Sequence, residues 1–139
     1  MKYLIYAGIL LAMTGPSYGI TFTNSGQNNY IDVNVSTVNT TTGKSNDLFL
    51  NNVKIDPGES GSRPIFDKLS KIRNDLRGKL QNERVDITVY AKVQGVNVSN
   101  VHCTILTING HKSDKDLKSI ASGNVIFTNT DCNLVPQGK

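Results

Sequence analysis

The chain has 139 residues, of which 37% are hydrophobic and 6% aromatic, and its formal net charge at neutral pH is +4. This length suits one domain with a modest hydrophobic core. The charge is mildly basic and below the level typical of nucleic-acid-binding proteins, so we expect no nucleic-acid partner.

The N-terminal residues have the pattern of a cleavable secretory signal peptide. Lys2 gives a short positive start, and an apolar run follows over residues 3–13. This run is shorter than the roughly 20 apolar residues that a membrane-spanning helix needs. A Gly-Pro break comes next, and the small residues Ser17 and Gly19 suit a cleavage site directly after Gly19.

We therefore predict a signal peptide over residues 1–19 and a single β-rich domain over residues 20–139. The domain is then secreted or periplasmic, and we do not expect it to be transmembrane, because no later stretch is apolar enough to span a bilayer. The alternative interpretation of the N-terminal run is a buried strand or helix of the domain itself.

Three segments in the first part of this domain are predicted strands. Residues 30–38 alternate, with Ile31, Val33 and Val35 on an inner face and polar side chains between them. The other two predicted strands cover residues 20–24 and 47–55. Turn residues such as the Asp-Pro-Gly that follows residue 55 separate these segments.

One segment breaks the strand pattern and predicts an amphipathic helix over residues 64–80. Its apolar side chains recur at three- and four-residue steps, which places them on one helix face. Ser62 is a candidate N-cap for this helix. The apolar stripe consists of Ile65, Leu69, Ile72, Leu76 and Leu80.

Three strands and a second helix are predicted after it. Residues 84–93 alternate strictly between polar and apolar side chains, as a strand with one buried face does. Residues 101–108 carry apolar side chains on both faces, which is typical of a central strand. A weaker helix pattern covers Asp114–Ala121, and the last predicted strand covers residues 125–130.

These elements predict a mainly β protein of the α+β class, with one clear amphipathic helix. The architecture is either a small open β-barrel of the OB type or a β-sandwich, with the helix closing one end. The order of strands, helix and alternating strand resembles the middle of the OB-fold receptor-binding B subunits of bacterial AB5 toxins. The strands at residues 20–22 and 85–93 would equally suit a small immunoglobulin-like periplasmic protein.

Cys103 and Cys132 are the two cysteines of the chain. In an oxidising compartment they most simply form one intramolecular disulfide. Two free thiols or an intermolecular bond are the alternatives. The chain-entropy model gives a bridge that closes a loop of about 30 residues a stabilisation of about 3–4 kcal/mol.

The predicted helix is the most basic segment and offers a candidate binding face for an anionic glycan, lipid headgroup or protein. Its cations flank both sides of the apolar stripe, and acids are interleaved with them at four-residue steps. This pattern favours a solvated helix face that ion pairs stabilise over a concentrated binding patch. The basic residues of this face are Lys68, Lys71, Arg73, Arg77 and Lys79.

No catalytic motif or set of metal-ligating residues stands out in the sequence. His102 and Cys103 are neighbours, but adjacent residues of a strand point to opposite faces and cannot chelate one ion. Asp114 and Asp116 resemble the start of a calcium loop, but the later glycine and glutamate are missing. We therefore expect no catalytic, cofactor-binding or metal-binding residues.

Three glycosylation sequons begin at Asn34, Asn39 and Asn97, and their use depends on the source organism. The polar loops over residues 24–29 and 38–46 have the composition of ordinary β-turns. They also carry amides and hydroxyls that could bind sugars.

The expected function is a secreted or periplasmic, non-enzymatic binding module. Its target would be a glycan, an envelope component or a protein on a cell surface or in the envelope, and a role in virulence would fit such a target. The alternatives are a receptor-binding B-type toxin subunit or a subunit of a surface assembly. A small secreted hydrolase is the further alternative.

Overall fold

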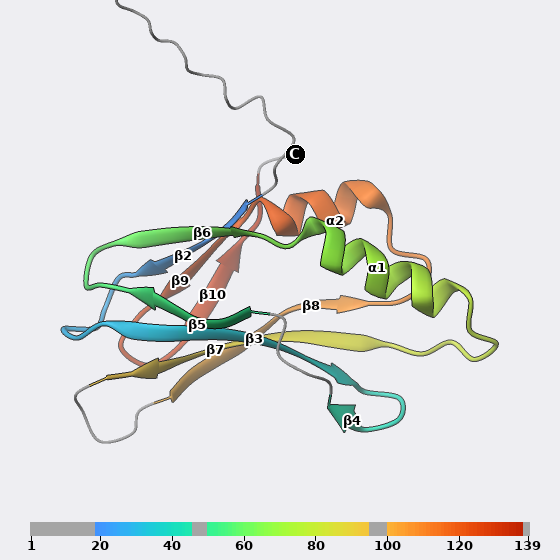
Figure 1. Cartoon of the computed structure of the whole chain (residues 1–139), viewed down its shortest axis with the longest axis horizontal. Helices are drawn as coiled ribbons and strands as arrows, with labels where there is room; N and C mark the ends of the chain where they lie inside the picture. The colour runs from blue at the N-terminus through green and yellow to red at the C-terminus, as the bar shows by residue number, and fades with distance from the viewer. Residues whose placement is uncertain (1–18, 46–49, 95–99, 138–139) are drawn as a thin grey trace, which may run out of the picture.

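The computed structural model describes residues 19–45, 50–94 and 100–137. Residues 1–18 of the predicted signal peptide lie outside the described residues. Residues 47–49 of one predicted strand and Asn97 of one sequon lie outside them too. Within the described part, the chain forms two β-sheets and two helices (Figure 1).

Four strands form the first sheet: β2 (Gly19–Asn24), β6 (Ser60–Pro64), β9 (Asn124–Phe127) and β10 (Cys132–Val135). They lie side by side in the order β10-β9-β2-β6. β2 runs parallel to β9, and the other two pairs are antiparallel. Both ends of the described chain therefore meet in this sheet.

Five strands form the second sheet: β3 (Ile31–Asn39), β4 (Lys44–Ser45), β5 (Leu50–Ile55), β7 (Val85–Val93) and β8 (Asn100–Ile108). Their order is β4-β3-β7-β8, and β5 pairs with another part of β3. All pairs in this sheet are antiparallel. The described chain is mostly β-strand with two helices, so the predicted mainly β class is confirmed. Neither sheet closes into a barrel, and two separate sheets fit the predicted sandwich architecture.

Two helices, α1 (Phe66–Arg77) and α2 (Asp114–Ala121), pack against each other beside the sheets (Figure 1). α2 covers the range that the sequence predicts. Ser113 caps its start, because the Ser113 side chain accepts a hydrogen bond of 3.1 Å from the backbone N–H of Asp116. Among the described residues, neither helix is long and apolar enough to cross a membrane.

α1 is shorter at both ends than the predicted helix. Its N-cap is Ile65, while Ser62 lies in β6 with its Oγ 2.9 Å from Oγ1 of Thr21. The helix ends at Gly78, and Leu80 is fully exposed. The N-cap prediction for Ser62 and the stripe prediction for Leu80 were wrong. Residues 60–64, which precede the helix, pair with β2 as strand β6, so Ser62 does not cap the helix. Gly78 ends the helix before it reaches Leu80.

The hydrophobic core lies between the sheets and beneath the helices. In β7 every second side chain from Val85 to Val93 is buried, as the strict alternation predicts. Ile31, Val33 and Val35 of β3 are fully buried as well. The first sheet and the helices complete the core with Ile20, Phe22, Val125, Phe127, Ile65, Leu69, Leu76, Leu117 and Ala121.

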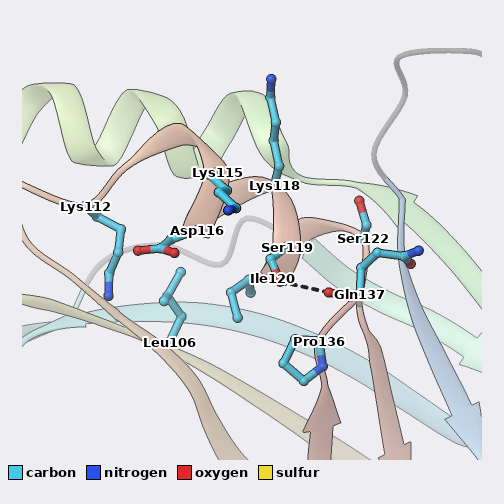
Figure 2. A pocket seen from close by; sticks show the side chains of 10 residues that line it. All are labelled: Leu106, Lys112, Lys115, Asp116, Lys118, Ser119, Ile120, Ser122, Pro136 and Gln137. Carbon is cyan, nitrogen blue, oxygen red and sulfur yellow. Dashed lines mark hydrogen bonds between the residues drawn. The ribbon is translucent and has the colours of Figure 1, made fainter. Parts of the chain in front are cut away.

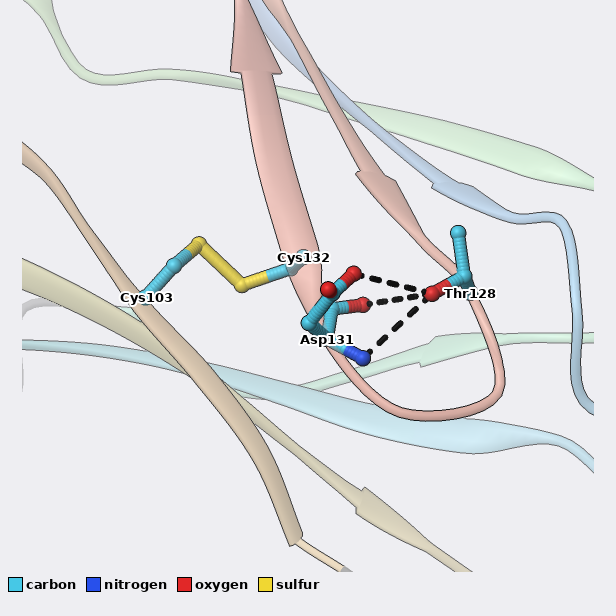
Figure 3. Close-up of a disulfide and its surroundings, with 4 residues drawn as sticks. All are labelled: Cys103, Thr128, Asp131 and Cys132. Carbon is cyan, nitrogen blue, oxygen red and sulfur yellow. Dashed lines mark hydrogen bonds between the residues drawn. A yellow bond between two sulfur atoms is a disulfide. The ribbon is translucent and has the colours of Figure 1, made fainter.

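Cys103 and Cys132 form a disulfide between β8 and β10 (Figure 3). Each of these strands lies at the edge of its own sheet, so the bond joins the two sheets covalently. The turn before β10 presents Cys132 to β8. In this turn the Thr128 hydroxyl donates to Oδ1 of Asp131 at 3.0 Å, and the Asp131 N–H donates back to that hydroxyl at 3.3 Å (Figure 3). The predicted intramolecular bridge is confirmed.

Asn24, at the end of β2, is a fully buried polar residue. Its side-chain amide donates to the carbonyl oxygens of Asn29 at 3.0 Å and Ile55 at 3.2 Å. Its side-chain oxygen accepts from the N–H of Gln27 at 3.3 Å. Asn24 therefore ties the loop over residues 25–30 to the end of β5, and its amide is not exposed to a sugar as the composition of this loop had suggested.

Replacing Asn24 by alanine is expected to lower the free energy of unfolding by about 2 kcal/mol, because buried carbonyls lose their donor. Denaturant unfolding followed by circular dichroism measures the change. Asn133→Ala is the matched control, since Asn133 is exposed on β10. A loss for Asn24→Ala no larger than that of the control would contradict the structural role of Asn24.

Candidate functional site

Arg73, one of the five basic residues predicted on the helix face, is buried, with 6% of its surface exposed. Its guanidinium donates from Nη2 to Oδ1 of Asp114 at 2.6 Å and from Nη1 to the carbonyl oxygen of Lys112 at 2.7 Å. Its Nε donates to Oδ1 of Asn74 at 2.7 Å. The bonds to Asp114 and Lys112 tie α1 to the start of α2, while the bond to Asn74 lies within α1. The Arg73 side chain is therefore part of the packing between the helices and does not offer a free charge at the surface.

Three of the remaining cations also contact the chain itself. Lys71 pairs with Asp75 at 3.6 Å, and Lys79 pairs with Glu83 at 3.8 Å. Arg77 donates from Nε to the carbonyl oxygen of Gly110 at 3.1 Å. These contacts agree with a solvated helix face that ion pairs stabilise.

Lys68, the fifth cation of the predicted face, is exposed on α1. Arg77 and Lys79 line a small cavity of about 280 Å³, together with His111 and the exposed Leu80. The structure therefore does not gather the five predicted residues into one surface.

The ion pair with Arg73 also sets the acidity of Asp114. Hydrogen bonding to the guanidinium holds the pKa of the Asp114 carboxyl below its ordinary value, and the charges of Arg73, Lys118 and Arg77 act in the same direction. Partial desolvation opposes this shift. The carboxylate is thus the favoured form of Asp114 in the folded chain at neutral pH.

Lowering the pH is expected to remove the stabilisation that this ion pair provides. Because the pKa of Asp114 is depressed on folding, the stabilisation is complete above the unfolded value of about 3.9 and is lost as the pH falls through the folded value. The difference in free energy of unfolding between the wild type and Asp114→Asn should be constant above about pH 5 and shrink below about pH 4. Denaturant unfolding over a pH series tests this, and a difference that does not change down to about pH 2 would refute it.

The residues considered for metal binding have other places in the fold. Cys103 is in the disulfide, His102 is exposed on β8, and His111 lies in the turn after β8. Among residues 19–45, 50–94 and 100–137, no three His, Cys, Asp or Glu side chains come together as a metal site requires. Asp114, considered for a calcium loop, is instead the partner of Arg73.

The asparagines of two sequons are used within the fold. Asn34 is 7% exposed, and its side-chain oxygen accepts from the N–H of Asn52 at 3.0 Å. Asn52 has a positive φ of 55°, within the irregular part of β5 that covers Asn34. Asn39 donates to Oε1 of Glu83 at 2.8 Å and accepts from the N–H groups of Thr41 and Thr42. The alternation pattern placed Asn34 on the outer face, but it could not show that β5 buries it.

A hollow of about 630 Å³, which we call the α2 groove, lies on the described surface (Figure 2). It lies between α2, β8 and the segment after β10. Its floor is aliphatic and consists of Leu106, Ile120 and Pro136. Its rim is polar and consists of Lys112, Lys115, Asp116, Lys118, Ser119, Ser122 and Gln137.

Specific contacts hold the two ends of the α2 groove. At one end the N–H of Gln137 donates to the carbonyl oxygen of Ser119 at 3.1 Å, and the Ser119 hydroxyl donates to the carbonyl oxygen of Gln137 at 3.1 Å (Figure 2). At the other end the guanidinium of Arg73 holds the carbonyl oxygen of Lys112. The groove is therefore formed by the fold before any ligand binds.

Gly123 lets the C-terminal segment pass close to the end of α2. A Cβ atom at this position would lie 2.8 Å from the carbonyl oxygen of Val135. A side chain here would push β10, and Pro136 after it, away from the helix. The absence of a side chain at this position therefore allows Pro136, which lines the groove, to lie close to the end of α2.

The lysines of the α2 groove differ in direction. Nζ of Lys118 lies 5.7 Å from the ring centroid of Phe66 in α1, and Figure 2 shows this side chain pointing away from Leu106 and Pro136. The side chain of Lys112 instead points to the side of α2 on which Leu106 lies, and both residues line the groove (Figure 2). Lys112 is thus the cation best placed beside the aliphatic floor.

The basic residues that the sequence offers as a binding face lie on the first helix and do not include Lys112, Lys115 or Lys118. The available signal was the second helix pattern, where Leu117 and Ala121 are buried while Ile120 stays partly exposed. Ile120, three residues after Leu117, flanks this stripe and packs against the core while keeping part of its surface exposed, so it can also contact a second element. That second contact can be recognised only once Leu106 and Pro136 are known to lie beside it.

No protein-family model matches the chain, and searches of curated proteins and of solved structures found no match.

Proposed function

We propose that this chain is a secreted or periplasmic, non-enzymatic binding module that holds its ligand in the α2 groove. The ligand is a glycan, an envelope component or a segment of a partner protein. The observation that carries this proposal is the groove itself, because it combines an aliphatic floor with a polar rim in a hollow of about 630 Å³. Ligand sites are concave and largely formed in advance, with a few polar groups around apolar ones.

The contacts of the groove favour binding over catalysis. A nucleophilic serine needs a base within hydrogen-bond reach. The Ser119 hydroxyl instead donates to the carbonyl oxygen of Gln137. The lysines of the rim are suited to attract a negative charge and to hold it beside the floor.

Export is supported by the disulfide between Cys103 and Cys132 and by the signal-peptide pattern of residues 1–19. Disulfides form and persist in oxidising compartments such as the periplasm and the extracellular space. A bond that joins the two sheets would strengthen a small binding domain outside the cell.

The test compares a groove variant with a matched variant elsewhere. Ile120→Glu places a charge in the groove floor, whereas Ile126→Glu makes the same change on β9, outside the groove lining. Glycan arrays and pull-downs from envelope extracts are run with the oxidised protein, and thermal melts confirm that both variants fold.

We expect the wild type and Ile126→Glu to retain the same ligand and Ile120→Glu to lose at least about tenfold in affinity, since an apolar contact is replaced by a desolvated charge. The proposal would be overturned if the wild type retains no ligand, or if Ile120→Glu binds the retained ligand as tightly as the wild type does.

A further inference from the structure

We infer that the occupant of the α2 groove is an extended peptide segment of a partner protein that carries a carboxylate next to an aliphatic side chain. This inference rests on the proposed function, because it names the class of ligand for the same groove. It follows from three properties of the lining: its charge, the short extent of its apolar floor and its uncommitted hydrogen-bonding groups.

The charge of the rim favours an anion. Lys112 and Lys115 line the groove together with one acid, Asp116, while Lys118 points toward Phe66, so positive charge still exceeds negative charge there. The backbone of Lys112 is held by Arg73, which fixes the point from which its ammonium group reaches the floor. A carboxylate beside Lys112 and Lys115 is therefore the complementary group, and Asp116 opposes a second anion close to it.

The floor is too short for a lipid chain. Leu106 and Ile120 are partly buried, Pro136 is exposed, and the other lining residues are polar or charged. This floor is large enough to remove one aliphatic side chain of the size of leucine from contact with water. A long acyl chain would run on to lysine and serine side chains, and a sugar covered with hydroxyls offers little apolar surface to bury.

The rim also offers hydrogen-bonding groups to a peptide backbone. The Ser122 hydroxyl and the side-chain amide of Gln137 line the groove and make no hydrogen bond with other residues in the described part of the chain. A hydroxyl and an amide can each donate and accept, as peptide N–H and C=O groups require. Both residues lie at the end of the groove opposite Lys112, and the amide of Gln137 is turned away from Ile120 (Figure 2). An extended segment that starts at the lysine and runs past this end would contact both groups.

The experiment uses three arrays of hexapeptides with the oxidised full domain. In the first array each peptide carries one Asp or Glu next to one Leu, Ile or Val, and serine fills the other positions. In the second array lysine replaces the acids, and in the third array serine replaces the aliphatic residues. Dodecanoate and an oligomer of uronic acid are tested beside them as an anionic lipid and an anionic glycan.

We expect binding to the first array alone. The best peptide should lose at least about tenfold in affinity with Lys112→Glu, since an attractive charge contact becomes repulsive. Lys92→Glu, on exposed Lys92 of β7, is the control and should change the affinity less than about twofold. High salt should weaken binding to the wild type more than to Lys112→Ala.

The outcomes separate this inference from the function on which it rests. If dodecanoate or the uronic acid oligomer binds, Ile120→Glu abolishes that binding, and the peptides do not bind, the groove is a ligand site but the peptide inference is overturned. If peptides bind equally to the wild type, Ile120→Glu and Lys112→Glu, both are overturned.

Discussion

Replacing Cys103 and Cys132 together by alanine is expected to lower the free energy of unfolding by about 3–4 kcal/mol. The two cysteines are separated by 29 residues in the sequence. Without the bond, this loop is no longer closed in the unfolded chain, so the conformational entropy of the unfolded state rises. The bond also joins the edge strands β8 and β10 of the two sheets. The native state therefore loses its covalent link between layers at the same time.

Denaturant unfolding of the wild type and the double variant, each with and without reductant, measures this effect. Reductant should destabilise the wild type by about the same amount as the double substitution and leave the double variant unchanged. Equal stabilities of the oxidised wild type and the double variant would contradict the role that the structure gives to this bond.

Replacing Arg73 by alanine is expected to cost about 2–4 kcal/mol. The side chain is nearly buried, and its removal leaves the carbonyl oxygen of Lys112 without its donor. It also separates α1 from Asp114 at the start of α2. Arg73→Lys should recover only part of the loss, because an ammonium group cannot reach three acceptors in the planar arrangement of a guanidinium.

Arg63→Ala is the matched control for Arg73→Ala. Arg63 is exposed on β6, and its guanidinium bonds to the carbonyl oxygen of its own neighbour Ser62. We expect this control to change the free energy of unfolding by less than about 0.5 kcal/mol. If Arg73→Ala is no more destabilising than Arg63→Ala, the contact between α1 and α2 does not depend on the guanidinium.

The strands and helices with strong periodicity could be predicted from the sequence. The burial of every second side chain in β7 and the limits of α2 follow from local patterns. β6 has no such pattern, since its sequence is Ser-Gly-Ser-Arg-Pro, and it exists because β2 pairs with it. The same holds for β4, a strand of two residues, which pairs with the end of β3. Pairings between distant segments, such as β2 with β9, depend on which inner faces fit together, and no local pattern contains that information.

The candidate site depends even more on such distant contacts. The five basic residues of the first helix could be grouped by position, but the burial of Arg73 depends on Asp114, 41 residues further along the chain. The α2 groove is formed by residues from β8, α2 and the C-terminal segment, which no spacing rule connects. The disulfide could be predicted because two cysteines in an oxidising compartment leave one simple pairing.

Chemical-shift mapping of the ¹⁵N-labelled domain, titrated with the ligand that the binding screens retain, tests the central claim that the α2 groove is the ligand site. If the α2 groove is the ligand site, the largest chemical-shift changes arise at the backbone amides of Leu106, Lys112, Ser119, Ile120 and Gln137. The amide signals on the outer face of β7 then stay unchanged. Shifts concentrated on the exposed face of α1 or on the outer faces of the sheets, with those groove amides unmoved, would contradict it.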